Sequence, residues 1–134
     1  MKHFFIVNPV AGNGKSLKYI PEIENMFRNR KEEYIVKLTE KPGHATEIAR
    51  EYTQVDDSRI YSVGGDGTLN EIVNGIAGGK SSLAVIPGGC GNDFIKSISN
   101  NWNTSDILKR TVEGREKPVD LANVNGRYFI NIAS

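Results

Sequence analysis

Residues 60–71 read IYSVGGDGTLNE, and this segment indicates the fold most clearly. Its first four residues form a short apolar run, which is typical of a strand buried inside a sheet. Apolar residues then recur at Leu69, Ile72, Val73 and Ile76, which is the spacing of one face of a helix. The glycines and the aspartate between the two patterns therefore predict a strand, a tight turn and the start of a helix.

The predicted turn has the chemistry of a phosphate site that also holds a metal ion. Glycines let a ligand approach the backbone closely, and a helix start offers unpaired N–H groups and a partial positive charge. The carboxylate of Asp66 at the same point would repel a bare phosphate. A divalent cation between them resolves this conflict, because Mg²⁺ prefers carboxylate and phosphate oxygens. We therefore favour a nucleotide triphosphate site over a glycine-rich turn that binds nothing.

Length and composition indicate one ordinary globular domain. The chain has 134 residues, of which 38% are hydrophobic and 25% charged, enough for a real core. A net charge of +1 gives no reason to expect nucleic acid as a partner. A single cysteine excludes an intrachain disulfide framework. The apolar run at the N-terminus is too short, and polar residues follow it too early, for a signal peptide. We therefore expect a cytoplasmic location.

Apolar runs alternate with helical patterns along the first two thirds of the chain. Each short run reads as a strand buried on both faces of a parallel sheet. A polar turn, often with glycine, separates each strand from the helix that follows. This alternation predicts an α/β domain with strands at 4–7, 34–38, 60–63 and 83–86. A helix is expected to start near Ile20, and two more have apolar faces that begin with Ala45 and Leu69.

The loop after the first strand, residues 8–16, partly matches two nucleotide-binding motifs but satisfies neither. Gly14, Lys15 and Ser16 match the end of a P-loop, but that motif requires glycine at position 9, where this chain has Pro9. A dinucleotide fingerprint fails as well, because Leu17 stands where its third glycine should be. A solvated polar loop is the alternative.

Farther along, His44 has no partner motif and is expected at the surface.

A second glycine turn with an acid, PGGCGNDF at residues 87–94, follows the fourth strand. Two such turns at the carboxyl ends of parallel strands point to one crevice, because ligands of open α/β sheets bind along that edge. Thr39 ends the second strand at the same edge. Near the end of the chain, Asn125-Gly126 lies between two apolar runs and predicts an antiparallel hairpin.

Taken together, the motifs identify a family. In order they are Asn8-Pro-x-Ala-Gly12, Gly64-Gly-Asp-Gly-Thr-Leu-Asn-Glu71, Pro87-x-Gly-x-x-Asn-Asp-Phe94, and Asp120-Leu-x-x-Val-Asn with Phe129-x-Asn131. The chain resembles the N-terminal half of the catalytic domain of diacylglycerol kinases and the related bacterial lipid, ceramide and sphingosine kinases. The resemblance runs from Phe4 to Ile132. It implies a three-layer α/β fold related to NAD kinase and phosphofructokinase, with helices on both faces of a mostly parallel sheet.

The resemblance also implies an activity and its site. ATP would donate a phosphoryl group to a lipid hydroxyl, that of diacylglycerol or a related lipid alcohol. Acids matching Asp66, Asp93 and Asp120 would organise Mg²⁺ and its waters, with Asp66 as the principal catalytic acid. Peripheral membrane contact is expected in the full-length protein, and the sequence leaves homodimerisation open. The implied nucleotide contacts are Asn8, Pro9, Val10, Ala11, Gly12, Thr39, Gly65, Asp66, Gly67, Thr68, Leu69, Asn70, Glu71 and Cys90.

The chain departs from the family at two points. The family usually has threonine where Cys90 stands, and a thiol is a weaker hydrogen-bond partner than a hydroxyl. The family also continues into a β-rich C-terminal domain, which residues 1–134 do not contain, so we expect a fragment without turnover. Two alternatives to a lipid kinase follow: an NAD kinase-like phosphotransferase, which shares Gly-Gly-Asp-Gly-Thr, and a nucleotide-binding module without catalysis.

Overall fold

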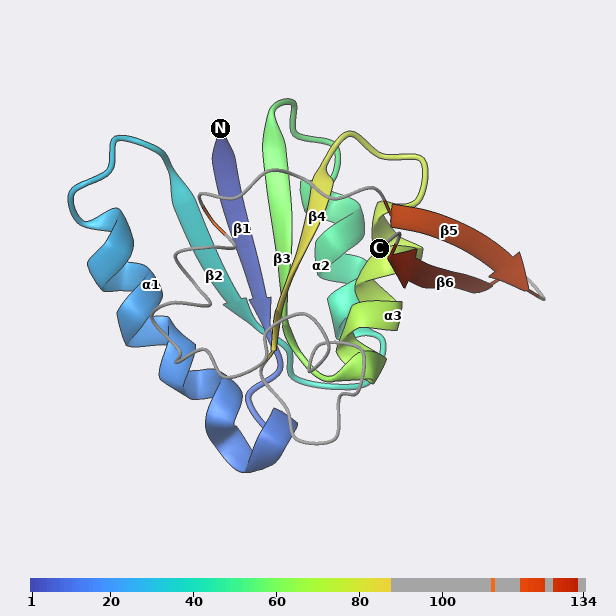
Figure 1. Cartoon of the computed structure of the whole chain (residues 1–134), viewed down its shortest axis with the longest axis horizontal. Helices are drawn as coiled ribbons and strands as arrows, with labels where there is room; N and C mark the ends of the chain where they lie inside the picture. Colours follow the sequence, from blue (N-terminus) through green and yellow to red (C-terminus); the bar gives the residue numbers. More distant parts are fainter. Residues whose placement is uncertain (88–111, 113–118, 125–126, 133–134) are drawn as a thin grey trace.

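A computed structural model of the chain describes residues 1–87, 112, 119–124 and 127–132 (Figure 1). Within them a four-stranded sheet alternates with helices, as the sequence predicts, and a pair of strands follows. The elements are β1 (Lys2–Val7), η1 (Ala11–Lys18), α1 (Tyr19–Phe27), β2 (Tyr34–Leu38), α2 (His44–Tyr52), β3 (Ser58–Gly64), α3 (Asp66–Ile76), β4 (Ser82–Pro87), β5 (Val119–Val124) and β6 (Arg127–Ile132).

The four-stranded sheet is parallel throughout and has the order β2-β1-β3-β4. Val7 at the end of β1 lies opposite Leu38 of β2 and Val63 of β3. Gly64 at the end of β3 lies opposite Pro87 of β4. The carboxyl ends of all four strands therefore meet at one edge, which we call the carboxyl rim. In Figure 1 this edge is at the lower side of the view, where the arrowheads of β1 and β2 point.

Two apolar cores lie on the two faces of this sheet, because successive side chains of a strand point to opposite sides. On one face, Phe5, Val7 and Tyr61 pack with Ile23 and Phe27 of α1. The other core joins alternate strand residues to α2 and α3, and its members are Phe4, Ile6, Ala45, Ile48, Ala49, Ile60, Ile72 and Ile76. Helices thus cover both faces, which confirms the three-layer α/β architecture (Figure 1).

The connection from β1 to α1 differs from the expected polar loop. Residues Ala11–Lys18 form the 3₁₀ helix η1, interrupted by three residues with positive φ, namely Gly12, Asn13 and Gly14. Asparagine is one of the few side chains that tolerate this left-handed conformation, which explains its place between two glycines. The regular helix α1 begins at Tyr19, one residue before the predicted start. Pro21 therefore lies in its first turn, where the missing N–H costs no helical hydrogen bond.

Helices α2 and α3 pack closely because one contact position carries no side chain. A methyl group at Gly75 would lie 2.5 Å from the carbonyl oxygen of Thr46 and 2.8 Å from Cβ of Ala49. Real Cβ atoms do not approach other atoms so closely, so a larger residue would force the helices apart. Gly75 thereby sets the spacing of two helices that both begin at the carboxyl rim.

The predicted C-terminal hairpin strands are present as the antiparallel pair β5–β6, with Asp120 opposite Asn131. This pair forms a separate sheet, and β6 contacts α3 (Figure 1). The Asn-Gly turn at 125–126 lies outside the described residues. Between β4 and β5 the structure describes one residue, Val112, which is helical and buried in the core on the α1 face.

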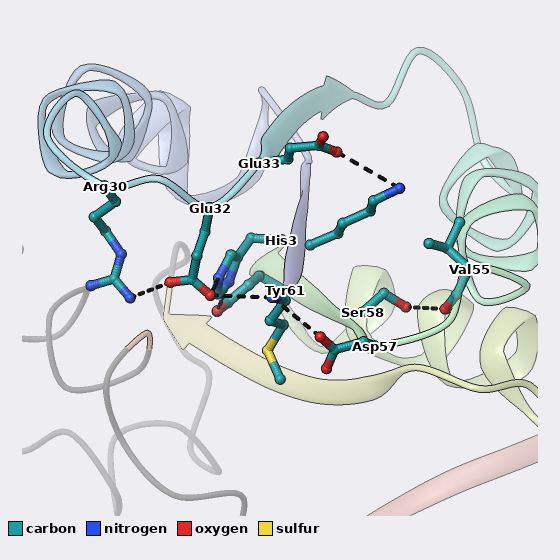
Figure 2. Close-up of polar contacts among 10 residues, drawn as sticks. His3, Arg30, Glu32, Glu33, Val55, Asp57, Ser58 and Tyr61 are labelled. Carbon is teal, nitrogen blue, oxygen red and sulfur yellow. Dashed lines mark hydrogen bonds and ion pairs between the residues drawn. The ribbon is translucent and has the colours of Figure 1, made fainter.

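At the opposite, amino edge of the sheet lies a polar cluster that the sequence did not predict (Figure 2). His3 is 1% exposed; its Nδ1 lies 2.6 Å from the hydroxyl of Tyr61 and its Nε2 lies 3.0 Å from Oε2 of Glu32. Arg30 donates to Oε1 of Glu32 over 2.5 Å. Burial raises the pKa of Tyr61 to about 12, so the phenol stays protonated. The Glu32 carboxylate beside Nε2 can only accept, which leaves Nδ1 of a neutral His3 to accept from the phenol. Nε2 then carries the proton that His3 donates to Glu32.

Candidate phosphate site at the carboxyl rim

The first loop of the rim is organised by Asn8, the residue directly after β1. Its backbone N–H donates to the carbonyl of Val63 over 3.0 Å, which ties the loop to β3. The side-chain Oδ1 accepts the N–H of Val10 over 3.1 Å, and the carbonyl oxygen accepts from Ala11 and from the hydroxyl of Ser16. The Asn8 side chain is therefore occupied in holding the loop at the rim.

The turn from β3 to α3 follows the predicted pattern. Gly65 is extended and is the N-cap of α3, and Asp66 is the first helical residue. The first backbone bond of the helix runs from the N–H of Leu69 to the carbonyl of Gly65 over 3.1 Å. The N–H groups of residues 66–68 therefore have no partner within the helix, and no side chain caps it at Gly65. These donors lie at the positive end of the helix dipole, where an anion is stabilised.

Contacts among the described residues do not explain why positions 65 and 67 are glycine. Neither has a positive φ, and a Cβ at either position would meet no described atom within 4 Å. Gly64 differs, because a Cβ there would lie 2.8 Å from Oγ1 of Thr68. Packing thus accounts for Gly64, whereas the bare backbone at Gly65 and Gly67 leaves open space beside the helix start, as close approach of a ligand requires.

Asp66 is exposed at this helix start, and it fits the role of a metal ligand. Mg²⁺ in nucleotide sites is commonly held by one or two carboxylates together with substrate phosphates and water. The described residues contain no group of three or more His, Cys, Asp or Glu side chains that could enclose a metal by themselves. The start of α3 therefore offers a carboxylate beside amide donors without helical partners, which suits a metal that arrives with a phosphate.

The other predicted site residues in the described ranges divide into two groups. Thr39 follows β2 at the rim, and its N–H donates to the carbonyl of Val7 over 2.9 Å. Pro9 and Gly12 are half-buried and Val10 is 77% exposed in the first loop. Within α3, by contrast, Leu69 is buried, and the carbonyl of Asn70 accepts from Asn74. These two residues lie in the body of the helix, beyond the amide donors of residues 66–68.

Glu71 makes a contact that sequence reasoning missed. Its Oε1 accepts the backbone N–H of Gly43, in the turn before α2, over 2.8 Å. No local signal could reveal this bond, since the partners are far apart in the sequence and meet only when α2 and α3 pack. Cys90 and Asp93 lie outside the described residues. Asp120 lies in β5, in the separate two-stranded sheet, so its predicted metal role stays a prediction.

Comparison with known proteins decides the family. Residues 2–124 match the family model described as the diacylglycerol kinase catalytic domain. The chain belongs to the diacylglycerol kinase catalytic domain family. It is 37% identical over 133 residues to a diacylglycerol kinase of Bacillus subtilis (strain 168), and 37% identical over 134 residues to one of Staphylococcus carnosus (strain TM300).

Solved structures of this family agree with the fold. A diacylglycerol kinase from Bacillus anthracis str. Sterne superposes with a TM-score of 0.74 at 34% identity, covering 96% of this chain and 49% of that one. The two curated relatives are each covered over 43% of their length. This member of the diacylglycerol kinase family thus spans less than half the length of the curated relatives it matches. No helix among its described residues is long and apolar enough to cross a membrane.

Proposed function

We propose that this chain is the ATP-binding half of a lipid kinase. The full enzyme would transfer the γ-phosphoryl group of ATP to the hydroxyl of diacylglycerol or a related lipid alcohol. The observation that supports this most is the start of α3. There Asp66 is exposed beside amide donors without helical partners, and beside two glycines that no contact among the described residues requires. Family membership supplies the reaction class.

Different residues of the rim would bind different parts of a magnesium-bound triphosphate. Backbone N–H groups of residues 66–68 donate to phosphate oxygens, and Gly65 and Gly67 let the phosphates come close. Asp66 would hold Mg²⁺, which neutralises phosphate charge when bound. Asn8 and Thr39 shape the neighbouring loops. Cys90, Asp93 and Asp120 belong to the proposed site only because the family resemblance implies a role for them.

Such a set of groups suffices for the donor side of phosphoryl transfer. This chemistry depends on positioning and on charge stabilisation far more than on covalent catalysis by the protein. Amide donors at a helix start are rigid, so they need little reorganisation as charge develops. The lipid acceptor would bind mainly in the remainder of the full-length protein, which would act in the cytoplasm with peripheral contact to a membrane. We therefore expect this chain alone to bind Mg-ATP without turnover.

A chimera tests the proposal directly. This chain replaces the matching part of the Bacillus subtilis diacylglycerol kinase, which is 37% identical to it, and transfer from γ-labelled ATP is measured with diacylglycerol and with NAD as acceptors. We expect label on diacylglycerol and its loss in the Asp66→Ala chimera. Cooperative thermal unfolding checks that each chimera is folded. A folded chimera that labels NAD and not diacylglycerol, or near-normal transfer by Asp66→Ala, would overturn the proposal.

A further inference from the structure

The connection between β2 and α2, residues 39–43, runs along the carboxyl rim beside the proposed phosphate site. It leaves the sheet at Thr39, whose N–H donates to the carbonyl of Val7. Before α2 it closes a turn in which the N–H of His44 donates to the carbonyl of Lys41 over 3.2 Å. Gly43 takes the left-handed conformation there, with φ +85°. We call residues 39–43 the rim loop.

Two side-chain contacts fix the shape and the position of the rim loop. His44 accepts the backbone N–H of Glu40 at Nδ1 over 2.9 Å, which closes the loop on itself. Glu71 reaches across from α3 and accepts the N–H of Gly43 over 2.8 Å. The carbonyl of Glu71 also accepts the hydroxyl of Thr46 over 2.8 Å. One residue of α3 thus holds both the end of the rim loop and the first turn of α2.

This arrangement gives Glu71 a role that differs from direct contact with a nucleotide. Its carboxylate is already used as an acceptor, and a second negative charge close to a triphosphate would be unfavourable. We infer that Glu71 is a positioning residue, which holds the rim loop at a fixed place beside the start of α3. This inference rests on the proposed function. The loop carries Thr39, one of the residues that the family resemblance places at the nucleotide.

The positioning role makes a distinctive prediction, because it depends on reach and on an acceptor oxygen rather than on charge. Glu71→Gln keeps the acceptor at the same distance from Gly43 and removes the charge. Glu71→Asp keeps the charge and shortens the side chain by one methylene. A positioning role therefore predicts that glutamine restores function and that aspartate does not, whereas direct action of the charge on a metal predicts the opposite order.

The test uses the full chain with calorimetric titration of Mg-ATP and amide hydrogen exchange at Gly43. Relative to wild type, we expect Glu71→Ala and Glu71→Asp to weaken binding about five- to tenfold and to speed exchange at Gly43. Glu71→Gln should stay within about twofold in affinity and keep the Gly43 amide protected. The matched control is Glu51→Ala, an exposed acid near the end of α2, which should change neither quantity.

The outcomes separate this inference from the proposed function. Should wild type bind no Mg-ATP, the proposed function fails, whatever the variants do to the Gly43 amide. Should wild type bind, a loss in Glu71→Gln as large as in Glu71→Ala would overturn the positioning role alone. If Glu71→Ala does not fold, as judged by thermal unfolding, the comparison of Glu71→Asp with Glu71→Gln still decides the question.

Discussion

The side-chain amide of Asn8 donates a hydrogen bond to the hydroxyl of Thr68 over 3.2 Å, and this contact joins the first loop of the carboxyl rim to the start of α3. Gly64 lies between the two side chains, where a methyl group would come within 3.3 Å of Cβ of Asn8 and 2.8 Å of Oγ1 of Thr68. The two loops are thus held together by one polar contact across a position that only glycine fits.

We predict that the Asn8–Thr68 bond contributes measurably to stability. Thr68 is 5% exposed, so Thr68→Val would leave the Asn8 amide short of an acceptor in a half-buried place and should lower the free energy of unfolding by about 1 kcal/mol. In an Asn8→Ala background the same substitution should cost about 1 kcal/mol less, because its partner is gone. Urea unfolding of the four chains measures the coupling; equal costs in both backgrounds would show that the contact adds nothing.

Substitutions at the glycines of the turn between β3 and α3 should separate effects on stability from effects on ligand binding. Gly64→Ala meets Thr68 and should destabilise the fold by about 1–3 kcal/mol. Gly67→Ala meets no described atom, so its free energy of unfolding should change by less than about 0.5 kcal/mol. Its added methyl would nevertheless occupy the space where phosphates approach, and we expect weaker Mg-ATP binding. A Gly67→Ala chain that binds as wild type does would contradict the assignment of this space to a ligand.

The cluster around His3 should make stability depend on pH in two separate ranges. Burial lowers the pKa of His3 below 6.5, whereas hydrogen bonds from Arg30 and His3 lower the pKa of Glu32 to about 2. Charged groups around the cluster include Arg30, Arg59 and the N-terminal amine, which lies 3.6 Å from Glu32. Close to pH 7, His3 is neutral, and its contact with Glu32 is a hydrogen bond rather than an ion pair.

The direction in which stability changes with pH follows from the protons that the folded and unfolded chains bind. Below pH 6.5 the unfolded chain protonates His3 more readily than the folded one, so stability falls as the pH falls through 6.5. The contribution of Glu32 is present above its ordinary value of 4.5 and is lost as the pH falls toward 2. Urea unfolding at a series of pH values should show both losses, and His3→Gln should remove the first. A slope near pH 6 that persists in His3→Gln would refute this origin.

The sequence predicts the layers of this fold because they depend on local patterns. The strand before Gly64 and the helix after it are visible in the apolar spacing, and the parallel direction of the strands follows from the alternation of strands and helices. The exposure of Asp66 at a helix start follows from the same pattern. These features require no knowledge of how separate elements meet.

What the sequence could not predict depends on contacts between distant elements. The bond from Glu71 to Gly43 exists because α2 and α3 pack closely at Gly75, and no local pattern reports that spacing. His3 lies in a run that reads as the edge of a strand, and its burial follows from partners in β3 and after α1. The 3₁₀ helix η1 was missed because its turn requires three consecutive left-handed residues, including Asn13.

We propose that the carboxyl rim binds a magnesium-bound triphosphate at Asp66. Isothermal titration of the chain with ATP, with and without Mg²⁺, tests it, using Asp66→Asn and the matched control Asp56→Asn, an exposed acid at the opposite edge of the sheet. We predict Mg²⁺-dependent binding by wild type and Asp56→Asn, weakened at least about tenfold in Asp66→Asn. Undiminished Mg²⁺-dependent binding by Asp66→Asn, or none by wild type, would contradict the claim.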